Sequence, residues 1–277
     1  MKKRLVFHFF IAKDWRTNPI YKIHFNCLDY YKECFDEAYF ALSLEDPNDI
    51  DSLYEVKQKL VDIFRALDKI EFERVPNTDF CECPTFKSQI AERIGKDDFV
   101  FFAHTKGVMN IKEFEKDKVY QWICGLYYFS LNEQKQDKGF LDRIFINNTH
   151  FISYGSFKLQ FYLKHKTFNK YEWYYCGTFF WINSKRLSDY IRINETKLPE
   201  MSDRFYSENF LGNIYPLIEN NPVFPGSYEI KGTDFQFLQY NKPVSIDAIP
   251  YYIEFLLRTE EEIKDYNSFF VKMTSVE

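Results

Sequence analysis

Short apolar segments alternate with amphipathic segments along the first 112 residues of the chain. The apolar segments have the length of strands that are buried on both faces, as in a parallel sheet. The segments between them carry apolar side chains at intervals of three and four residues, which is typical of helices that pack on a sheet. We therefore predict strands at Leu5–Ala12, Ala38–Leu44, Ile70–Val75 and Asp98–Ala103, separated by helices at Ile20–Phe35, Ser52–Leu67 and Thr85–Ile94.

Strands that alternate with helices of this length predict right-handed βαβ units. The expected fold class is α/β, with a mixed, mainly parallel central sheet flanked by helices, and ligands of such sheets gather at the carboxyl ends of the strands. The alternation becomes less regular beyond residue 112. There we predict helices at Phe114–Phe129, Ser202–Tyr215 and Pro250–Tyr266, and strands of mixed orientation at Phe151–Tyr162 and Trp173–Ile182.

The chain has 277 residues, enough for one large domain with a smaller appendage. We predict a single α/β domain over residues 1–225, divided near residue 112, and a C-terminal helical extension over residues 226–277 that packs on it. The extension carries Ile253, Leu257 and Ile263 among charged residues. Because the segment is too acidic for an anionic lipid face, docking on its own domain or on a second subunit is favoured over peripheral contact with a membrane.

Charge and cysteine content narrow the class of protein. The formal net charge is -5 with acids and bases mixed along the chain, so nucleic acid is not an expected partner. No stretch of about 18 uninterrupted apolar residues is present, and Met1–Arg4 leads into a strand-like segment rather than a signal peptide. The six cysteines are scattered, so we expect them to be reduced and mostly buried in a soluble, cytoplasmic protein.

The segment Phe101–Gly107 is the most informative stretch of the sequence. An apolar strand delivers His104, Thr105, Lys106 and Gly107 to the edge of the sheet where ligands bind. The lysine could neutralise a phosphate, the histidine and threonine could donate hydrogen bonds, and the glycine would permit close approach. The alternative is a strand end followed by an ordinary turn with a solvated lysine.

His-Thr-Lys-Gly after an apolar strand resembles the motif of a group of bacterial glycosyltransferases. These enzymes build capsular, lipopolysaccharide or rhamnan-type cell-surface polysaccharides and have the nucleotide-diphospho-sugar transferase fold called GT-A. Three other segments resemble the group in the same order, and together the matches span roughly residues 5 to 215. These segments are Val75–Asp79, Tyr175–Trp181 and Asp203–Gly212.

The resemblance implies a donor site at the carboxyl ends of the first four strands. Residues 1–112 would form the nucleotide-sugar half and residues 113–225 the acceptor half. Asn77 and Asp79 would help to seat the nucleoside, and His104–Gly107 would hold the diphosphate. Asn77 and Asp79 also suit an ordinary turn, because turns favour Asn and Asp for backbone reasons.

GT-A enzymes generally hold a divalent metal, manganese or magnesium, with an Asp-x-Asp element after the fourth strand. In this chain His104-Thr105-Lys106 takes that place, so no metal ligands are assigned and no cofactor is certain. The literal Asp-x-Asp, Asp49-Ile50-Asp51, follows the second strand and has the pattern of a helix start, with acids near its positive end. A lysine could do part of the cation's work on a leaving diphosphate.

The acceptor half contains the expected catalytic carboxylate. We choose Glu208 as general base, with Asp203 as the substitute, because transfer to a hydroxyl needs a carboxylate near the acceptor proton. The alternative for Glu208 is an acid in a first helical turn, favoured by the helix dipole. Gly177, Phe180 and Trp181 are the candidates for acceptor binding by stacking on a sugar, although a buried strand would use the same residue types.

These features together predict a glycosyltransferase. It would move a sugar from a nucleotide-sugar donor to a hydroxyl of a glycan or lipid-linked acceptor in cell-surface polysaccharide synthesis, with inversion if Glu208 faces the anomeric carbon. A sugar-phosphate nucleotidyltransferase is a second reading, but Ala12–Arg16 after the first strand contains no glycine. A non-catalytic carbohydrate-binding or assembly protein is a third, with the aromatic residues, 20% of the chain, as its platform.

Overall fold

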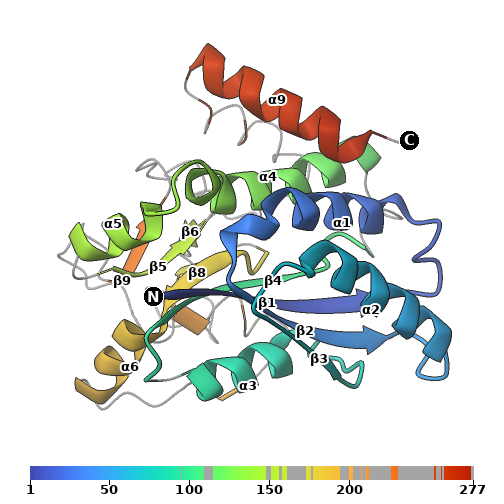
Figure 1. Cartoon of the computed structure of the whole chain (residues 1–277), viewed down its shortest axis with the longest axis horizontal. Coiled ribbons are helices and arrows are strands. Elements are labelled where there is room, and N and C mark those ends of the chain that lie inside the picture. The colour runs from blue at the N-terminus through green and yellow to red at the C-terminus, as the bar shows by residue number, and fades with distance from the viewer. Residues whose placement is uncertain are drawn as a thin grey trace.

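A central sheet lies between two layers of helices in the computed structural model of the chain (Figure 1). The sheet has seven strands in the order β3-β2-β1-β4-β8-β5-β9, and β6 pairs with β7 beside it. This arrangement confirms the predicted α/β class with a mainly parallel mixed sheet. The structure describes residues 1–93, 95–108, 115–147, 151–155, 158–160, 173–175, 177–193, 200–201, 207, 210–211, 226–229, 253, 257 and 259–275.

The first four strands are parallel to one another, and strand β8 is antiparallel to both of its neighbours. The predicted strands of the first 112 residues are confirmed, with ends that move by one to three residues. The strands are β1 (Lys2–Ile11), β2 (Glu37–Leu44), β3 (Lys69–Arg74), β4 (Asp98–His104), β5 (Phe151–Gly155), β6 (Lys158–Gln160), β7 (Trp173–Tyr175), β8 (Phe180–Asn183) and β9 (Gly226–Glu229).

Helices cover both faces of the sheet (Figure 1). The first helix begins where its sequence favours a start, because the Asn18 side chain accepts from the Ile20 N–H and Pro19 follows it. One face carries α1 (Pro19–Tyr31), α2 (Ile50–Phe64), α4 (Lys116–Gln136) and α5 (Phe140–Asn147), with a 3-10 turn at Lys32–Cys34, and the other carries α3 (Cys83–Arg93) and α6 (Ser184–Ile193).

Alternation along β1 divides its side chains between the two helical layers. Leu5, Phe7 and Phe9 are buried in the larger core under α1, α2 and α4, whereas Val6 is buried in the smaller core over α3 and α6. Burial of one such side chain contributes about 1.5–3 kcal/mol. His8 is buried on the same side as Val6, where the buried hydroxyls of Ser43 and Thr85 also lie.

A third layer is formed by α9 (Glu260–Thr274), which packs on the outer side of α1 and α4 (Figure 1). Tyr266 and Phe269 are buried in this contact, and the Asn26 amide donates to the Met273 carbonyl. A capping box of Thr259 and Glu262 starts α9 at Glu260. In the predicted segment before it, Ile253 is helical and its carbonyl accepts from the Leu257 N–H, and most of the other residues lie outside the described part of the chain. The C-terminal helix therefore docks on its own chain.

Other predicted elements differ from the structure beyond residue 112. Helix α4 runs seven residues past the predicted end at Phe129, and α5 and α6 were not expected. The predicted strand Trp173–Ile182 is interrupted, because Gly177 and Thr178 have φ values of 100° and 57° that no strand contains. Most of the predicted helix Ser202–Tyr215 lies outside the described residues.

The sheet also continues past the predicted division at residue 225, because β9 pairs with β5. The division of the chain into domains stays a prediction.

Candidate functional site

The order of the strands directs attention to the carboxyl ends of β1 and β4. Strands β1, β2 and β3 follow one another across the sheet toward one edge. The chain then returns, and β4 pairs with the other side of β1. Ligands of open α/β sheets bind in the crevice outside the carboxyl ends of the strands at such a reversal. The predicted segment His104–Gly107 begins at the last residue of β4 and lies at this reversal.

Thr105 fastens β4 to β1 beyond the end of their strand pairing. Its backbone N–H donates to the His8 carbonyl over 3.1 Å, and its Oγ1 accepts from the Phe10 N–H over 2.9 Å. The residue is buried. Its hydroxyl oxygen therefore serves the fold, whereas the sequence alone indicated a donor to a ligand.

Lys106 is half-buried at the same edge. Its Nζ lies 5.0 Å from the centroid of the Trp122 ring on α4, a cation–π contact that helps to place the ammonium group. Its carbonyl accepts from His24 Nε2 over 2.9 Å. The other ring nitrogen of His24 faces the Tyr127 hydroxyl over 2.9 Å, and burial lowers the pKa of His24 to about 3. A neutral histidine with both ring nitrogens paired thus supports the turn formed by residues His104–Gly107, which we call the lysine turn.

Gly107 has a φ of 84°, a conformation that residues with a Cβ rarely adopt. A Cβ at this position would lie 2.9 Å from Ile123 Cδ1 and 3.0 Å from Val119 Cγ1. We expected the glycine to make room for a ligand. The structure shows that helix α4 occupies the space beside it.

His104 lies between two acceptors from different parts of the chain. Its Nε2 is 3.0 Å from the Gly177 carbonyl oxygen, and its Nδ1 is 3.5 Å from Glu82 Oε2. The side chains of His104 and Glu82 are only 12% and 10% exposed. The imidazole therefore joins the loop after β3 to the turn before β8.

Glu82 is a buried carboxylate that the sequence analysis missed. Its Oε1 accepts from Ser207 Oγ over 3.0 Å and lies 3.5 Å from Thr178 Oγ1. The Thr178 and Ser207 hydroxyls are 3.2 Å apart, and the Cys83 thiol lies 3.7 Å from Ser207 Oγ. A charged residue directly before an amphipathic helix was the available signal, but helix starts favour acids in any case. The contacts that distinguish this one are all distant in sequence.

His8 lies next to this group on the inner strand β1. Its ring nitrogens face Thr85 Oγ1 at 2.9 Å and Ser43 Oγ at 3.0 Å. Burial lowers the pKa of His8 to about 4, partly offset by the charge of Glu82. Both ring nitrogens of His8, like those of His24, thus have partners inside the fold, and the two histidines are structural.

Asn77 and Asp79 are exposed on the loop between β3 and α3. This loop turns at Thr78, whose carbonyl accepts from the Cys81 N–H over 3.0 Å, and Cys81 has a φ of 51°. Glu82 connects the end of the loop to His104. The two predicted nucleoside contacts thus lie on a surface loop that is fastened to the carboxyl end of β4.

The stacking role expected for Phe180 and Trp181 needs correction. Both side chains are fully buried, on opposite faces of β8. Trp181 stacks on Phe35 with ring centroids 5.6 Å apart, and its Nε1 donates to the Ser130 carbonyl. Neither ring is available to a sugar. Gly177 contributes its carbonyl to His104 instead.

Glu208 and Asp203, the predicted general base and its substitute, lie outside the described residues. Ser207, which precedes Glu208 in the sequence, is buried and donates to Glu82. The structure therefore brings together His104, Thr105, Lys106, Gly107 and Gly177 at one end of β4.

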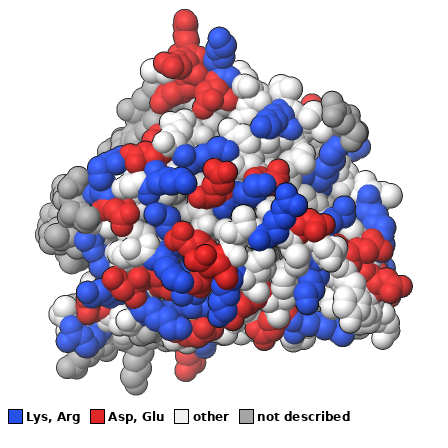
Figure 2. All heavy atoms as spheres, in the orientation of Figure 1, with Lys and Arg blue, Asp and Glu red and all other residues white. Residues whose placement is uncertain are grey.

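No group of three or more metal-binding side chains occurs among the described residues. The Asp49 carboxylate caps helix α2, where it accepts from the Ser52 N–H and the Ser52 hydroxyl, and these bonds lower its pKa. The prediction that the Asp-x-Asp segment starts a helix is confirmed. Figure 2 shows acidic and basic side chains interspersed over the visible face.

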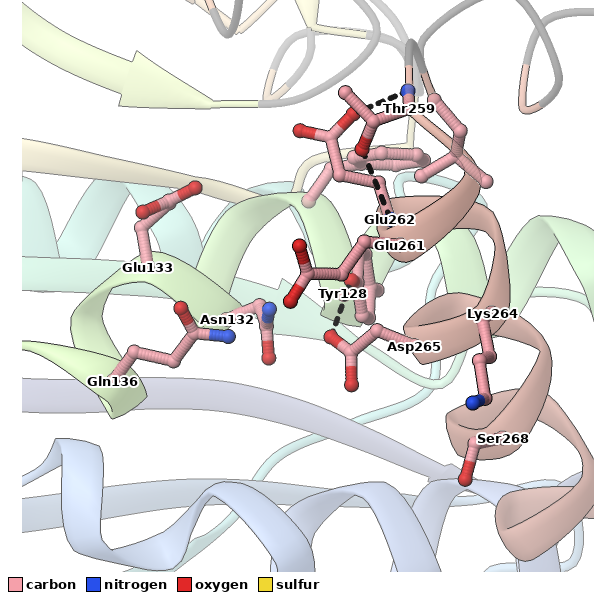
Figure 3. A pocket seen from close by; sticks show the side chains of 12 residues that line it. Tyr128, Asn132, Glu133, Gln136, Thr259, Glu261, Glu262, Lys264, Asp265 and Ser268 are labelled. Carbon is pink, nitrogen blue, oxygen red and sulfur yellow. Dashed lines mark hydrogen bonds between the residues drawn. The ribbon is translucent and has the colours of Figure 1, made fainter.

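A hollow of about 680 Å³ lies between α4 and α9, on the side of α4 that faces away from the sheet (Figure 3). Half of its lining residues are acidic or amide, among them Glu133, Glu261 and Asn132. Asp265 accepts from the Tyr128 hydroxyl over 2.7 Å, and Glu262 closes the cap of α9. Asp265 therefore serves the contact between the two helices, and Glu262 serves the start of α9.

Within the described part of the chain, no helix has the length and apolar character needed to cross a membrane. No protein-family model matches the chain, and no curated protein is significantly similar to it. The geometry at the carboxyl ends of β1 and β4 is therefore the basis on which a function can be assigned.

Proposed function

We propose that the protein is a glycosyltransferase of the GT-A type, which uses a nucleotide-sugar donor and a hydroxyl of a glycan or lipid-linked acceptor. The observation that carries the proposal is the placement of Lys106. It follows the last residue of β4 by two positions, at the strand reversal where α/β sheets bind nucleotides, and it is held against Trp122.

Lys106 supplies positive charge to the donor diphosphate. When the sugar is transferred, negative charge grows on the leaving nucleoside diphosphate, and a fixed ammonium group stabilises it. His104, Thr105 and Gly107 serve this lysine indirectly, because their contacts hold the turn on β1, α4 and Gly177. Asn77 and Asp79 on the neighbouring exposed loop bind the nucleoside.

Glu208 accepts the proton of the acceptor hydroxyl, and Asp203 is its substitute. Such a base increases the rate by about 10²–10⁴-fold when it lies within hydrogen-bond reach of the proton. Support comes from Ser207, the preceding residue, which donates to Glu82 beside His104. Direct displacement with inversion follows if the carboxylate faces the anomeric carbon. The proposed setting is the cytoplasm or the inner face of the cell membrane, in cell-surface polysaccharide synthesis.

The first test is a thermal-shift screen against UDP-, GDP-, CMP- and dTDP-sugars, with and without manganese. One donor class should raise the melting temperature, because a ligand that binds the native state stabilises it. Stabilisation by manganese alone, without a nucleotide sugar, would contradict the assignment of the cation's work to Lys106.

Two lysine variants then test the site. Lys106→Gln should weaken donor binding by about tenfold, roughly the effect of one charge at a half-exposed site. Lys57→Gln is the matched control, because Lys57 also lies over an aromatic ring, 5.1 Å from the Phe72 centroid, but is exposed on α2. Equal donor affinity in the two variants would refute the role of Lys106.

Turnover separates the enzyme from a carbohydrate-binding protein. Glu208→Gln should abolish transfer and retain donor binding, since the amide cannot accept the proton. A wild-type protein that transfers sugar from none of the donors would favour the binding protein.

A further inference from the structure

Five residues form a buried polar group that we call the clasp: Glu82, His104, Gly177, Thr178 and Ser207. Two come from residues 1–112 and three from beyond residue 113, and the contacts join positions up to 125 apart in sequence. Buried polar atoms need partners, because an unpaired one costs about 1–3 kcal/mol. The polar atoms of the clasp are partners of one another, and the clasp lies next to the lysine turn.

The two groups that contact the His104 ring indicate which of its nitrogens carry protons. The Gly177 carbonyl can only accept, so Nε2 carries a proton. Nδ1 faces Glu82 Oε2, whose partner oxygen already receives hydroxyl donors from Ser207 and Thr178. A carboxylate in such surroundings is an acceptor, so Nδ1 must also carry a proton to bind it favourably. An ionised Glu82 at 3.5 Å thus pairs with an imidazolium that carries both ring protons.

Thr178 shows that the clasp holds a strained turn. It has a φ of 57°, which is an outlier for a β-branched residue and costs about 1–3 kcal/mol. Its hydroxyl contacts with Glu82 and Ser207, together with its burial, oppose relaxation of the turn. The preceding Gly177, at a φ of 100°, presents its carbonyl to His104. Strain of this kind persists where the surroundings enforce it, and it gathers at functional sites.

We infer that Glu82 is a positioning residue. It keeps His104 in the imidazolium form and, through this ring and Ser207, fixes the Gly177–Thr178 turn against the carboxyl end of β4. The clasp thereby sets the acceptor side of the site relative to the lysine turn. Its effect on turnover rests on the proposed function, whereas the charge of His104 and the order of the turn do not.

The charge of His104 can be measured in the wild-type protein by nitrogen NMR of labelled histidine, with His104→Asn to assign the signals. We expect both ring nitrogens to be protonated near pH 7.5, above the ordinary histidine range. The titratable groups that act on the ring include Glu82 and the two buried histidines His8 and His24. One bare ring nitrogen near pH 7.5 would overturn the inference.

Variants of Glu82 separate charge from geometry. In Glu82→Gln the amide can donate to Nδ1, so His104 should lose one proton while the turn stays in place. In Glu82→Ala, amide hydrogen exchange in the peptide that contains residues 177–179 should rise by at least about tenfold, because local opening becomes easier. Glu92→Gln, an exposed position on α3, the helix that begins directly after Glu82, is the matched control and should alter neither readout. A doubly protonated His104 in Glu82→Gln would refute the pairing, and this result stands even if Glu82→Ala fails to fold.

Kinetics connect the clasp to the reaction. With an active donor, Glu82→Ala should lower kcat by about tenfold or more with donor affinity changed less than about threefold, and Glu82→Gln should restore most of kcat. Equal loss of kcat in both variants, or a loss of donor affinity alone, would contradict a positioning role. If the wild type transfers no sugar at all, the proposed function fails, and the NMR and exchange results still decide the clasp.

Discussion

Replacing Gly107 with alanine tests whether backbone conformation and contact with α4 together define the lysine turn. The residue has a φ of 84°, and an added Cβ would meet Ile123 Cδ1 at 2.9 Å and Val119 Cγ1 at 3.0 Å. Both neighbours are fully buried, so neither can move into solvent. The substitution therefore adds strain and overlap at one position.

The expected magnitude follows from two contributions. A left-handed conformation costs an alanine about 1–2 kcal/mol relative to glycine, and overpacking a closed core by one methyl group costs about 1–3 kcal/mol. The sum is about 2–5 kcal/mol, before a gain of about 0.4–1 kcal/mol from the stiffer unfolded chain. We expect Gly107→Ala to lower the free energy of unfolding by about 2–4 kcal/mol.

Two other glycines isolate the contributions. Gly95 has a φ of 86° but open space, with the nearest atom, Ser188 Oγ, at 4.0 Å, so Gly95→Ala should lose only the conformational part. Gly139 has an ordinary φ and a nearest contact of 3.4 Å to Asp137 Oδ1, so Gly139→Ala should be neutral or slightly stabilising. Urea unfolding of all three variants gives the comparison. If Gly107→Ala were no less stable than Gly95→Ala, the argument from contact with α4 would be wrong.

Three further predictions concern stability. Burial lowers the pKa of His8 to about 4 and that of His24 to about 3, below the value near 6.5 in the unfolded chain. The unfolded chain therefore binds more protons at these two histidines as the pH falls below 6.5, and they should lower the free energy of unfolding by about 4 kcal/mol between pH 7.5 and 5. The inferred imidazolium of His104 opposes this by about 1.4 kcal/mol, because the unfolded chain gains that proton only as the pH falls, so the net drop should be about 2–3 kcal/mol; an unchanged urea midpoint over that range would contradict it. Thr178→Val removes a buried hydroxyl from Glu82 and Ser207 and should lower the free energy of unfolding, measured in urea, by about 1–3 kcal/mol. A variant as stable as the wild type would show that this hydroxyl is dispensable. Asp49→Ala should cost about 1 kcal/mol of thermal stability through loss of the α2 cap, and the nearby exposed Asp51→Ala should cost less; the reverse order would show that the cap is misassigned.

The strands of the first 112 residues could be predicted from the sequence, because burial on both faces makes each strand a short apolar run with polar flanks. The same reasoning failed for Trp181. An aromatic residue in a strand has the same local pattern whether it packs in the core or lines a binding surface, and only the packing of Phe35 on its ring decides the matter.

The clasp was not predictable for a different reason. Thr178 and Ser207 meet Glu82 across 96 and 125 positions in sequence, and no periodicity encodes contacts of that range. His8 gave no sign of its surroundings, since a single histidine among phenylalanines reads only as a satisfied core residue. The lysine turn itself was predictable in position, because the end of a parallel strand fixes it, but the inward engagement of Thr105 and Gly107 required the packing of β1 and α4.

The outer layer formed by α9 has a consequence for synthesis of the protein on the ribosome. The Asn26–Met273 hydrogen bond joins residues 247 positions apart. At about 5–20 residues per second, the surface of α1 that receives α9 waits roughly 12–50 s for its partner. During that interval Tyr30 and its neighbours on α1 are uncovered, so the nascent chain should depend on chaperones until its final helix emerges.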